Sequence, residues 1–341
     1  MVYEWNVLRT IACLSIVFLH SGTFVGFHFG LPEVDFYHLL RILLCYATPT
    51  FIVLSEIILA NRYNNHIPNG FFTKRLKYIL SPFIAFAFID ALVTYDFSIT
   101  ETTIKKFALN LMGNYEGYFI LIILQFYLLH YIVVKFKLTM FKFLPFALII
   151  MLGHLYILNY STSPLIVENR NYFKLPFTAW LGYFAVAYLI GTNYDKIKKN
   201  FSKFKWYIIC GVAISLFFIY YSYDLGMTWT NSRRMDLFPF VISITLLILY
   251  VGSKLKSNSI INLISNYSLG IYLLHWQVLR IITPHVIEWY GSTFTRVIAL
   301  FVLSLIISMI IIKLISMLPL GQFVVGKVKR QYPKTKQVLS N

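Results

Sequence analysis

Residues 5–20 read WNVLRTIACLSIVFLH, an apolar run with an arginine near its start and a histidine at its end. The run lacks the basic flank and the small-residue cleavage site of a secretory signal. We therefore expect it to remain in the protein as a membrane-spanning helix over residues 5–27. Ionisable groups inside such a helix are costly and mark function by default. Arg9 and His20 are thus the first candidate functional residues.

The spacing of these two residues predicts how they lie. An α-helix turns about 100° per residue, so Arg9 and His20 are about 20° apart around the axis and roughly 16 Å apart along it. They share a face but cannot touch. This suits one long ligand that enters from the cytoplasm, with anionic groups at Arg9 and a reactive end at His20. A snorkelling arginine and an interhelical histidine are the structural alternatives.

The composition of the whole chain identifies the class of protein. Of the 341 residues, 58% are hydrophobic and 13% are charged, whereas soluble globular chains have roughly 45–50% and 25%. An ordinary soluble enzyme, a disordered protein and a disulfide scaffold are excluded. We predict an all-α polytopic membrane protein with about ten transmembrane helices. They are expected at residues 5–27, 36–60, 76–96, 112–134, 143–160, 175–192, 206–222, 237–252, 262–283 and 294–318.

The distribution of charge predicts the orientation. If the N-terminus is inside, the inside segments hold 19 basic residues, and the outside segments and helix ends hold nine. This asymmetry favours both termini in the cytoplasm, and it accounts for the net charge of +17 without nucleic acid. We expect a transmembrane domain over residues 1–318 and a basic cytoplasmic tail over 319–341 at anionic headgroups. The inside segments are 61–78, 135–142, 193–205, 253–258 and 319–341.

Two further sets of polar residues are expected toward the cytoplasmic side. Glu56, in the second span, is at a depth where it can pair with Arg9, either as a lock between helices or in catalysis. Lys74, Arg75 and Lys77 open the third span in TKRLKYILSP. They are either a topology signal or a phosphate site for a cytosolic cofactor, since both side-chain types bind phosphate oxygens well.

Two other sets are candidates for contacts with substrate. Glu116 and Tyr118 precede the apolar run of the fourth span, near the outer face, where they can touch an outside acceptor or belong to an aromatic belt. Ser268, Tyr272 and His275 are spaced i, i+4 and i+7 and therefore share one helical face. The structural alternative for that face is helix packing through small and hydroxyl residues.

The chemistry that these residues can support is limited. The sequence has no glycine-rich phosphate loop, no zinc-type spacing of Cys or His, no nucleophile elbow and no pair of glycosidase carboxylates. We therefore expect no metal, a histidine general base and a co-substrate that arrives already activated. Acyl transfer from a thioester fits, because a neutral imidazole takes the acceptor's hydroxyl proton and the thiolate leaves unaided.

The order of these motifs resembles acyltransferase family 3, a family of membrane-bound O-acyltransferases. The family pattern of Arg, ten residues and His is similar to Arg9 and His20, and KRLKYILSP is similar to its basic segment ending in proline. Its late Ser, three residues, Tyr-Leu-Leu-His is similar to Ser268, Tyr272 and His275. Within the family, the chain most resembles the intercellular adhesion protein C type. The similar features are its size, the segments TPTFIVLS and RLKYIL, and the GYF…QF run.

The resemblance implies a function and roles for residues. The family moves acetyl, succinyl or longer acyl groups from cytoplasmic acyl-CoA to envelope polysaccharides of bacteria. His20 would be the base, Arg9 would steer the CoA arm, and Lys74, Arg75 and Lys77 would contact the CoA phosphates. A polysaccharide synthase would be a partner in the bilayer. Two departures are Asn6, where the family often has Asp, and Glu56, where it often has Gly after Ser. The adhesion type has also been described as an exporter, so polysaccharide export without acyl transfer is the alternative.

Overall fold

The computed structural model describes residues 2–32 and 36–328, and every regular element in these ranges is a helix. The all-α prediction is therefore confirmed for this part of the chain. Of the expected basic tail, residues 329–341 lie outside the described residues. In chain order the elements are α1 (Tyr3–Phe29), α2 (Tyr37–Leu44), α3 (Ala47–Arg62), α4 (Phe71–Arg75), η1 (Leu76–Leu80), α5 (Ser81–Thr94), α6 (Glu101–Leu111), η2 (Glu116–Tyr118), α7 (Phe119–Lys135), α8 (Met140–Tyr160), α9 (Pro164–Glu168), α10 (Arg170–Phe173), η3 (Phe177–Trp180), α11 (Leu181–Thr192), α12 (Tyr194–Asp224), α13 (Leu237–Lys254), α14 (Ser259–Trp289), α15 (Thr293–Met317) and α16 (Gln322–Val325).

Eight helical segments in the described residues are long and apolar enough to cross a membrane. The apolar segment Phe177–Thr192 is shorter, and α14 carries many polar residues along its 31 positions. Each predicted span overlaps one of these ten segments. The eight segments are Tyr3–Phe29, Tyr37–Arg62, Phe71–Thr94, Glu101–Lys135, Met140–Tyr160, Tyr194–Asp224, Leu237–Lys254 and Thr293–Met317.

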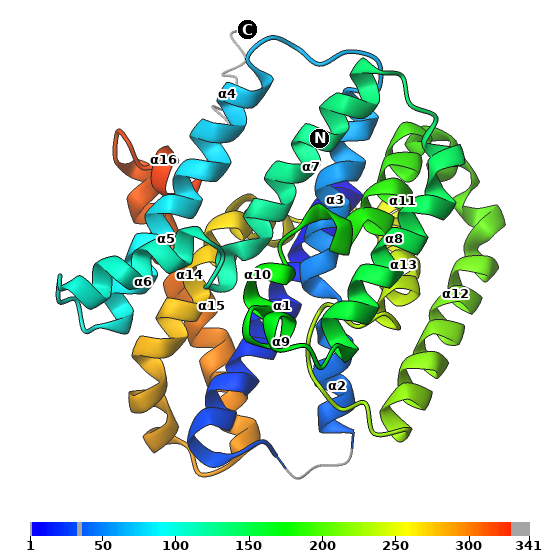
Figure 1. Ribbon diagram of the computed structural model, residues 1–341. Coiled ribbons are helices and arrows are strands. Elements are labelled where there is room, and N and C mark those ends of the chain that lie inside the picture. Colours follow the sequence, from blue (N-terminus) through cyan, green and yellow to red (C-terminus); the bar gives the residue numbers. More distant parts are fainter. Residues whose placement is uncertain (1, 33–35, 329–341) are drawn as a thin grey trace, which may run out of the picture.

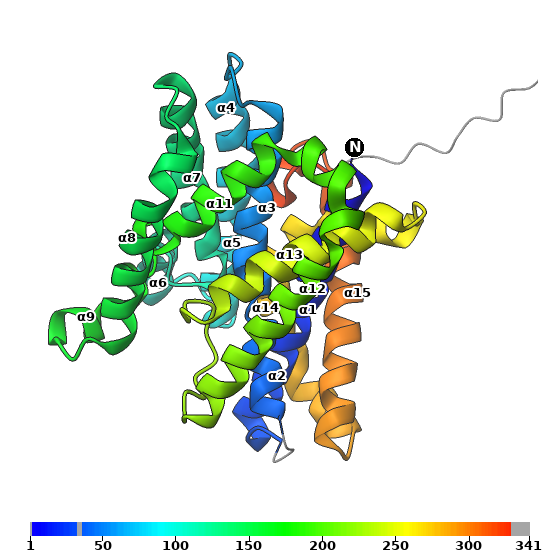
Figure 2. The same ribbon diagram turned by 90° about the vertical axis from the view of Figure 1, so that its right-hand side faces the viewer.

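The helices form a bundle with α1 near its middle, as Figures 1 and 2 show. The α1 helix packs against α3, α13, α14 and α15. In the most apolar part of α2 and α3, 72% of the residues are buried, against 17% in α12. A helix that is apolar all round and buried belongs to the core, whereas exposed apolar faces at the periphery suit contact with lipid. The core therefore consists of α1, α3 and their partners.

The predicted start of the seventh span, residue 206, is wrong. Residues 193–205 were expected to be an inside loop, but α12 begins at Tyr194 and runs unbroken to Asp224. Its first turns contact α1 through Glu4. This side chain accepts a hydrogen bond from Tyr194 and pairs with Lys198 at 2.5 Å. Lysine is a good helix former, so a lysine-rich extension continues a membrane helix into the aqueous phase.

The basic segment at the start of the third span has a local irregularity. Residues Leu76–Leu80 form a π-helical turn between α4 and α5, and such turns interrupt α-helices often at functional sites. Pro82 follows this turn at the start of α5 and has no backbone N–H to donate. Of the three basic residues, Lys74 and Arg75 precede the turn and Lys77 lies within it.

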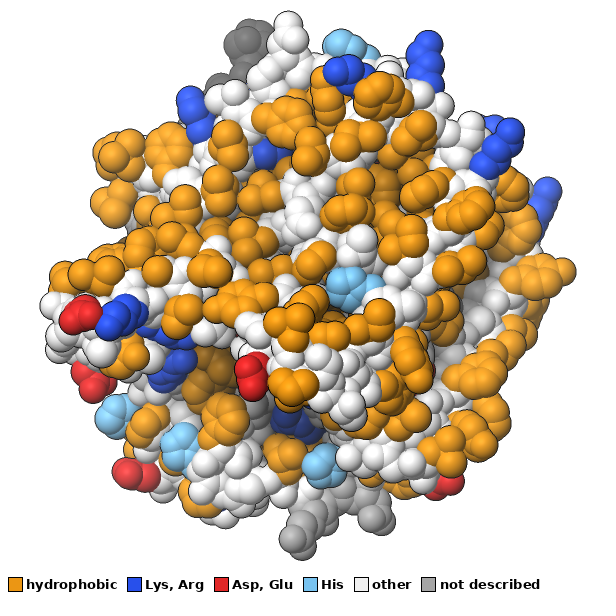
Figure 3. All heavy atoms as spheres, in the orientation of Figure 1, with side chains coloured by type: hydrophobic (Ala, Val, Ile, Leu, Met, Phe, Trp, Pro, Cys, Tyr) orange, Lys and Arg blue, Asp and Glu red, His pale blue; other side chains and the backbone are white. Residues whose placement is uncertain are grey.

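Charges are unevenly distributed over the surface. In the view of Figure 3, many Lys and Arg side chains lie along the upper edge, where no Asp or Glu is seen, whereas below the middle basic and acidic side chains are mixed. The start of α1, the α4 helix and α16 lie toward that upper end in both ribbon views. The first and last described helices therefore reach the same end of the bundle.

Candidate active site

The candidate site is built along the contact between α1 and α14. The Arg9 guanidinium donates to Ser265 Oγ at 3.1 Å, and Ser265 in turn donates to Asn6 Oδ1. Asn6 donates to Asn262 Oδ1 at 2.8 Å, so polar side chains of both helices are joined near their shared end. Within the described residues Arg9 makes no ion pair. Its charge is therefore available to an anionic ligand.

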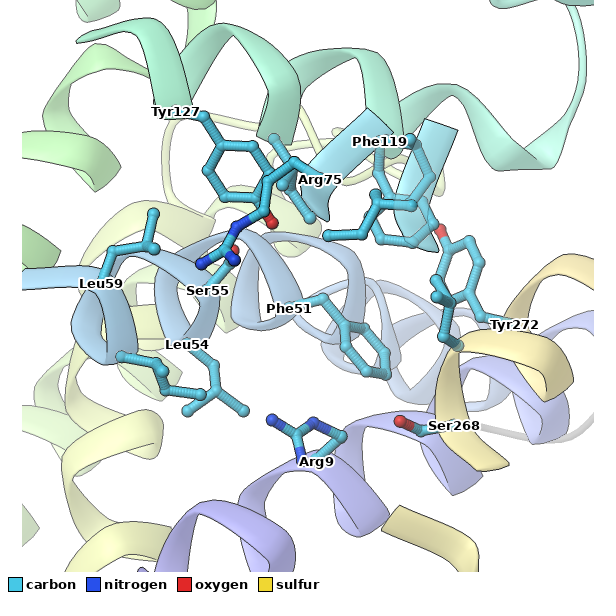
Figure 4. Close-up of a pocket in the computed structure, with 15 residues that line it drawn as sticks. Arg9, Phe51, Leu54, Ser55, Leu59, Arg75, Phe119, Tyr127, Ser268 and Tyr272 are labelled. Carbon is cyan, nitrogen blue, oxygen red and sulfur yellow. The ribbon is translucent and has the colours of Figure 1, made fainter. Parts of the chain in front are cut away.

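An inner cavity of about 280 Å³ lies beside Arg9. Figure 4 shows Arg9 and Arg75 pointing into it from opposite walls, while Phe119 and Tyr272 close one end. Ser55, Tyr127 and Ser268 also line it, and the remaining walls are mostly apolar. Two arginines at an apolar cavity can hold an anionic group and leave room for an apolar arm.

The three predicted cations of the third span do not lie in the same surroundings. Arg75 lines the inner cavity and lies over the ring of Phe71, 4.3 Å from its centroid. Lys74 and Lys77 are exposed and do not line that cavity. Arg75, which stacks on Phe71, is thus the one cation of the three that faces the cavity, and Lys74 and Lys77 face away from it.

An outer cavity of about 330 Å³ lies at the other end of α1. It contains His20 and the two predicted acceptor contacts, Glu116 and Tyr118, which come from the short helix η2. Its other polar walls come from α2 and from the connections around residues 171–174 and 230–233. The lining includes Thr23, Arg41, Thr48, Asn171, Lys174, Thr230, Asn231, Ser232 and Arg233.

A chain of hydrogen bonds fixes the protonation pattern of His20. The carbonyl of Ile271 can only accept, so His275 Nδ1, 3.0 Å away, carries the proton. Its Nε2 then accepts from His20 Nδ1 at 2.8 Å. The remaining nitrogen, His20 Nε2, keeps a free lone pair at the outer cavity, as a general base requires.

The surroundings of His20 hold its ring in place. The ring is nearly parallel to that of His275, at 7°, and lies edge-on to Trp276. Glu116 Oε2 is 3.8 Å from His20 Nε2, too far for a direct hydrogen bond. A hydroxyl group placed beside this gap reaches both atoms. The geometry therefore offers one position for an acceptor hydroxyl.

Basic groups outnumber the acid in the outer cavity. Lys174 lies over the ring of Tyr118, 4.3 Å from the centroid, and donates to Asn171 at 3.4 Å. Burial and, to a smaller extent, the nearby charge of Arg233 together lower the pKa of Lys174 to about 8, while Glu116 opposes the shift. Lys174 is therefore charged at neutral pH and loses its charge in mildly alkaline solution.

The two cavities meet at a partition, defined here as Thr48, Phe51, Phe119 and Tyr272. Tyr272 lines the inner cavity, Thr48 lines the outer one, and their hydroxyls are 3.2 Å apart. Phe119 packs on Tyr272 with ring centroids 4.1 Å apart, and Phe51 lies edge-on at 5.4 Å. The three residues of the predicted face therefore lie in different surroundings. Ser268 lines the inner cavity, Tyr272 belongs to the partition, and His275 supports His20.

Glu56 does not pair with Arg9 as expected. Its Oε1 is 2.7 Å from His130 Nδ1, and both side chains are fully buried. His130 Nε2 also donates to the carbonyl of Tyr63 at 3.2 Å. The α3 helix turns Glu56 toward α7 rather than toward α1. Glu56 therefore joins two helices and does not line either cavity described above.

Sequence reasoning missed Arg41, Lys174 and Arg233 as members of the site. Arg41 is 9% exposed, donates to Thr23 at 3.0 Å and has two further nitrogens without a partner. A buried cation near a span was a usable signal for it. The other two lie in connections whose course cannot be read from hydrophobic periodicity. Among the described residues, no group of three or more His, Cys, Asp or Glu could hold a metal ion.

Comparisons with known proteins find two kinds of similar protein, acyltransferases and polysaccharide export proteins. The family model described as an acyltransferase domain matches residues 2–313. YfiQ of Bacillus subtilis (strain 168), named as a candidate membrane-bound acyltransferase, is 34% identical over 292 residues and 80% of each chain. A protein of Staphylococcus aureus (strain MSSA476), named as a probable poly-β-1,6-N-acetyl-D-glucosamine export protein, is 26% identical across 95% of each chain. A protein of the same name from Staphylococcus epidermidis is 27% identical over 80% of this chain and 79% of its own. No solved structure matches the chain.

Proposed function

The chain belongs to the acyltransferase domain family and is a multi-pass bacterial membrane protein, and from this premise we propose that it transfers an acyl group from cytoplasmic acyl-CoA to a hydroxyl of a cell-surface polysaccharide. The observation that carries the proposal is the orientation of His20. Its free ring nitrogen lies at a polar cavity, and the Arg9 cavity lies on the other side of the partition.

The proposal includes a topology with ten membrane-spanning helices and cytoplasmic termini. Adding Phe177–Thr192 and α14 to the eight long apolar segments completes the number. The basic residues along one end of the molecule favour that end as the cytoplasmic side. This orientation places the inner cavity toward the cytoplasm and the outer cavity toward the polysaccharide.

The inner cavity is proposed to receive the acyl-CoA. Arg9 and Arg75 would contact its phosphates, and the apolar walls between them and Tyr272 would line the pantetheine arm. Guanidinium groups bind phosphate oxygens in a bidentate manner, which suits a ligand that must be held at one end. Lys74 and Lys77 would attract the anion from solution without touching it in the cavity.

The chemistry is a direct transfer in the outer cavity. His20 Nε2 takes the proton of the acceptor hydroxyl while the oxygen of that hydroxyl attacks the thioester carbonyl carbon. The carbon–sulfur bond then breaks, the ester forms, and the CoA thiolate recovers a proton from the imidazolium. His275 keeps the proton of His20 on Nδ1 throughout. The thioester has to pass Thr48 and Tyr272, so their hydrogen bond must open during the cycle.

The balance of charge in the outer cavity favours a succinyl over an acetyl group. Arg41, Lys174 and Arg233 face one acid, Glu116. Two nitrogens of Arg41 are buried without a partner, and a carboxylate on the acyl group would satisfy them. An acetyl group offers no charge to these cations.

The test measures ester and export in the same cells. Surface polysaccharide would be analysed by NMR for ester per sugar and weighed in total, for wild type, His20→Ala and His28→Ala. His28 is an exposed histidine at the end of the same helix and serves as the matched control. We expect only His20→Ala to lose ester, with normal export. Normal ester with lost export in that variant would favour the export function named for the staphylococcal relatives.

A further inference from the structure

A third hollow lies beside the outer cavity. It has a volume of about 200 Å³ and is formed by the end of α8, the end of α12 and the connection between α12 and α13. Figures 1 and 2 show the connection between α12 and α13 running from the far end of α12 back toward the middle of the bundle. This connection, residues 225–236, supplies most of the wall. Its polar and aromatic lining includes Asn159, Tyr160, Ser222, Trp229, Arg234 and Asp236.

The connection is held firmly from inside. Arg234, only 3% exposed, pairs with both oxygens of Asp236, at 2.5 and 3.0 Å. It also donates to the backbone carbonyls of Met227 and Trp229. A buried guanidinium that satisfies a carboxylate and two carbonyls fixes the backbone between them. The Trp229 side chain is therefore presented from a preorganised segment.

The same connection also forms a wall of the outer cavity. Residues 230–233 line that cavity, whereas Trp229 and Arg234, on either side of them, line the third hollow. Asn159 of the hollow donates to the carbonyl of Arg233 at 3.0 Å. The two spaces thus share one short piece of backbone, and a chain-like ligand can lie across it.

The lining has the chemistry that binds sugars. Tyr160 and Trp229 lie edge to face with ring centroids 6.2 Å apart, and they are 39% and 40% exposed. An aromatic face is electron-rich and attracts the C–H groups of a pyranose ring, and nearby amide and hydroxyl groups bond its hydroxyls. Ser222 and Asn159 supply such groups here.

We propose that the hollow of Tyr160 and Trp229 is a second polysaccharide subsite, which holds a sugar neighbouring the one placed at His20. This inference rests on the proposed function, because it takes the outer cavity as the acceptor site. The subsite would make the protein favour a polymer over a single sugar. Binding energy from a remote sugar positions the reacting one.

The test measures sugar binding without any acyl donor. The purified full-length protein in nanodiscs would be titrated with β-1,6-linked N-acetylglucosamine, from the monomer to about the hexamer. Variants would be Trp229→Ala, Trp229→Phe and Trp289→Ala. Trp289 is 70% exposed at the end of α14 and is the matched control for a tryptophan at the membrane surface. We expect Trp229→Ala to weaken hexamer binding about tenfold and leave monomer binding unchanged. Trp229→Phe should keep most of the affinity.

Ester formation in the same preparations separates the two proposals. Length-dependent binding that Trp229→Ala abolishes, without any ester formed, would leave the subsite standing and remove the acyltransferase. Ester formation with hexamer binding indifferent to Trp229→Ala would overturn the subsite. Equal loss of thermal stability in Trp229→Ala and Trp289→Ala, with unchanged sugar binding, would assign Trp229 to the lipid interface and also overturn it.

Discussion

The hydroxyl groups of Thr48 and Tyr272 lie 3.2 Å apart at the boundary between the two cavities of this protein. Thr48 comes from α3 and faces His20's cavity, whereas Tyr272 comes from α14 and faces that of Arg9. The contact is a single neutral hydrogen bond, worth about 1 kcal/mol. It is strong enough to hold a resting position and weak enough to open in each cycle.

The partition is expected to keep water from the thioester, and to fail when the ring of Tyr272 is removed. Tyr272→Ala should let water from the outer cavity reach the thioester, so acyl-CoA hydrolysis without polysaccharide should rise by about tenfold or more. Tyr272→Phe removes only the hydroxyl and should raise hydrolysis far less. Thiol release from acyl-CoA, measured with a chromogenic reagent, separates the two variants. Equal hydrolysis in Tyr272→Ala and wild type would show that the ring does not seal the cavities.

The bond between His20 and His275 predicts a loss in turnover rather than in donor binding. His275→Leu leaves His20 Nδ1 without its acceptor, so the ring loses its fixed orientation and proton pattern. We expect kcat to fall about 100-fold, with the KM for acyl-CoA nearly unchanged because the inner cavity is intact. His285→Leu, an exposed histidine on the same helix, is the control. A rise in KM alone would contradict the supporting role.

The basic segment predicts that its three cations differ. Arg75→Ala should raise the KM for acyl-CoA about tenfold, because Arg75 is the one cation of this segment that lines the inner cavity. Lys74→Ala and Lys77→Ala should each change it by about twofold and only at low salt, since exposed charges are screened. Steady-state kinetics at two salt concentrations give these values. An equal increase of the KM in all three variants would indicate that the segment attracts acyl-CoA only through its overall charge.

Lys174 predicts a dependence on pH with a defined sign. Burial lowers its pKa to about 8, so the side chain is cationic below that pH and becomes neutral above it. If it contacts an anionic acyl group, kcat/KM for succinyl-CoA should fall as the pH rises from 7 to about 9. In Lys174→Arg the charge persists, and the alkaline fall should disappear. Identical profiles of both proteins would exclude this contact.

The buried pair of Glu56 and His130 predicts an effect on stability. Removing one partner leaves a buried polar group unpaired, which costs about 3–5 kcal/mol. Glu56→Leu and His130→Leu should each lower the thermal midpoint in detergent markedly. The double variant should recover most of the loss, because two apolar side chains then pack together. Full donor affinity in the folded single variants would agree with the placement of Glu56 away from Arg9.

The sequence predicted the parts of the site that a single helix determines. The spacing of Arg9 and His20 and the shared face of Ser268, Tyr272 and His275 follow from helical periodicity alone. Contacts between side chains of two different helices cannot be predicted from the periodicity of either helix. The partner of Glu56 depends on the rotation of α3 against α7, and the bond of His20 to His275 depends on the register of α1 against α14.

The irregular segments were the least predictable. Lys174, Arg233 and Trp229 lie in connections whose paths are set by side-chain contacts such as that of Arg234 with Asp236. The predicted start of α12 is too late because a lysine-rich stretch indicates a loop by its charge, although lysine also favours a helix.

The unbroken course of α1 has a consequence for the choice of donor. Because Arg9 and His20 belong to one rigid rod, the distance between them cannot be shortened by a moving loop. The helix therefore holds Arg9 and His20 at a fixed separation of roughly 16 Å along its axis. An activated acyl group anchored at Arg9 reaches the histidine only if its own arm spans that length. Short thioesters that lack the nucleotide end should diffuse past the anchor and be poor donors, however reactive they are.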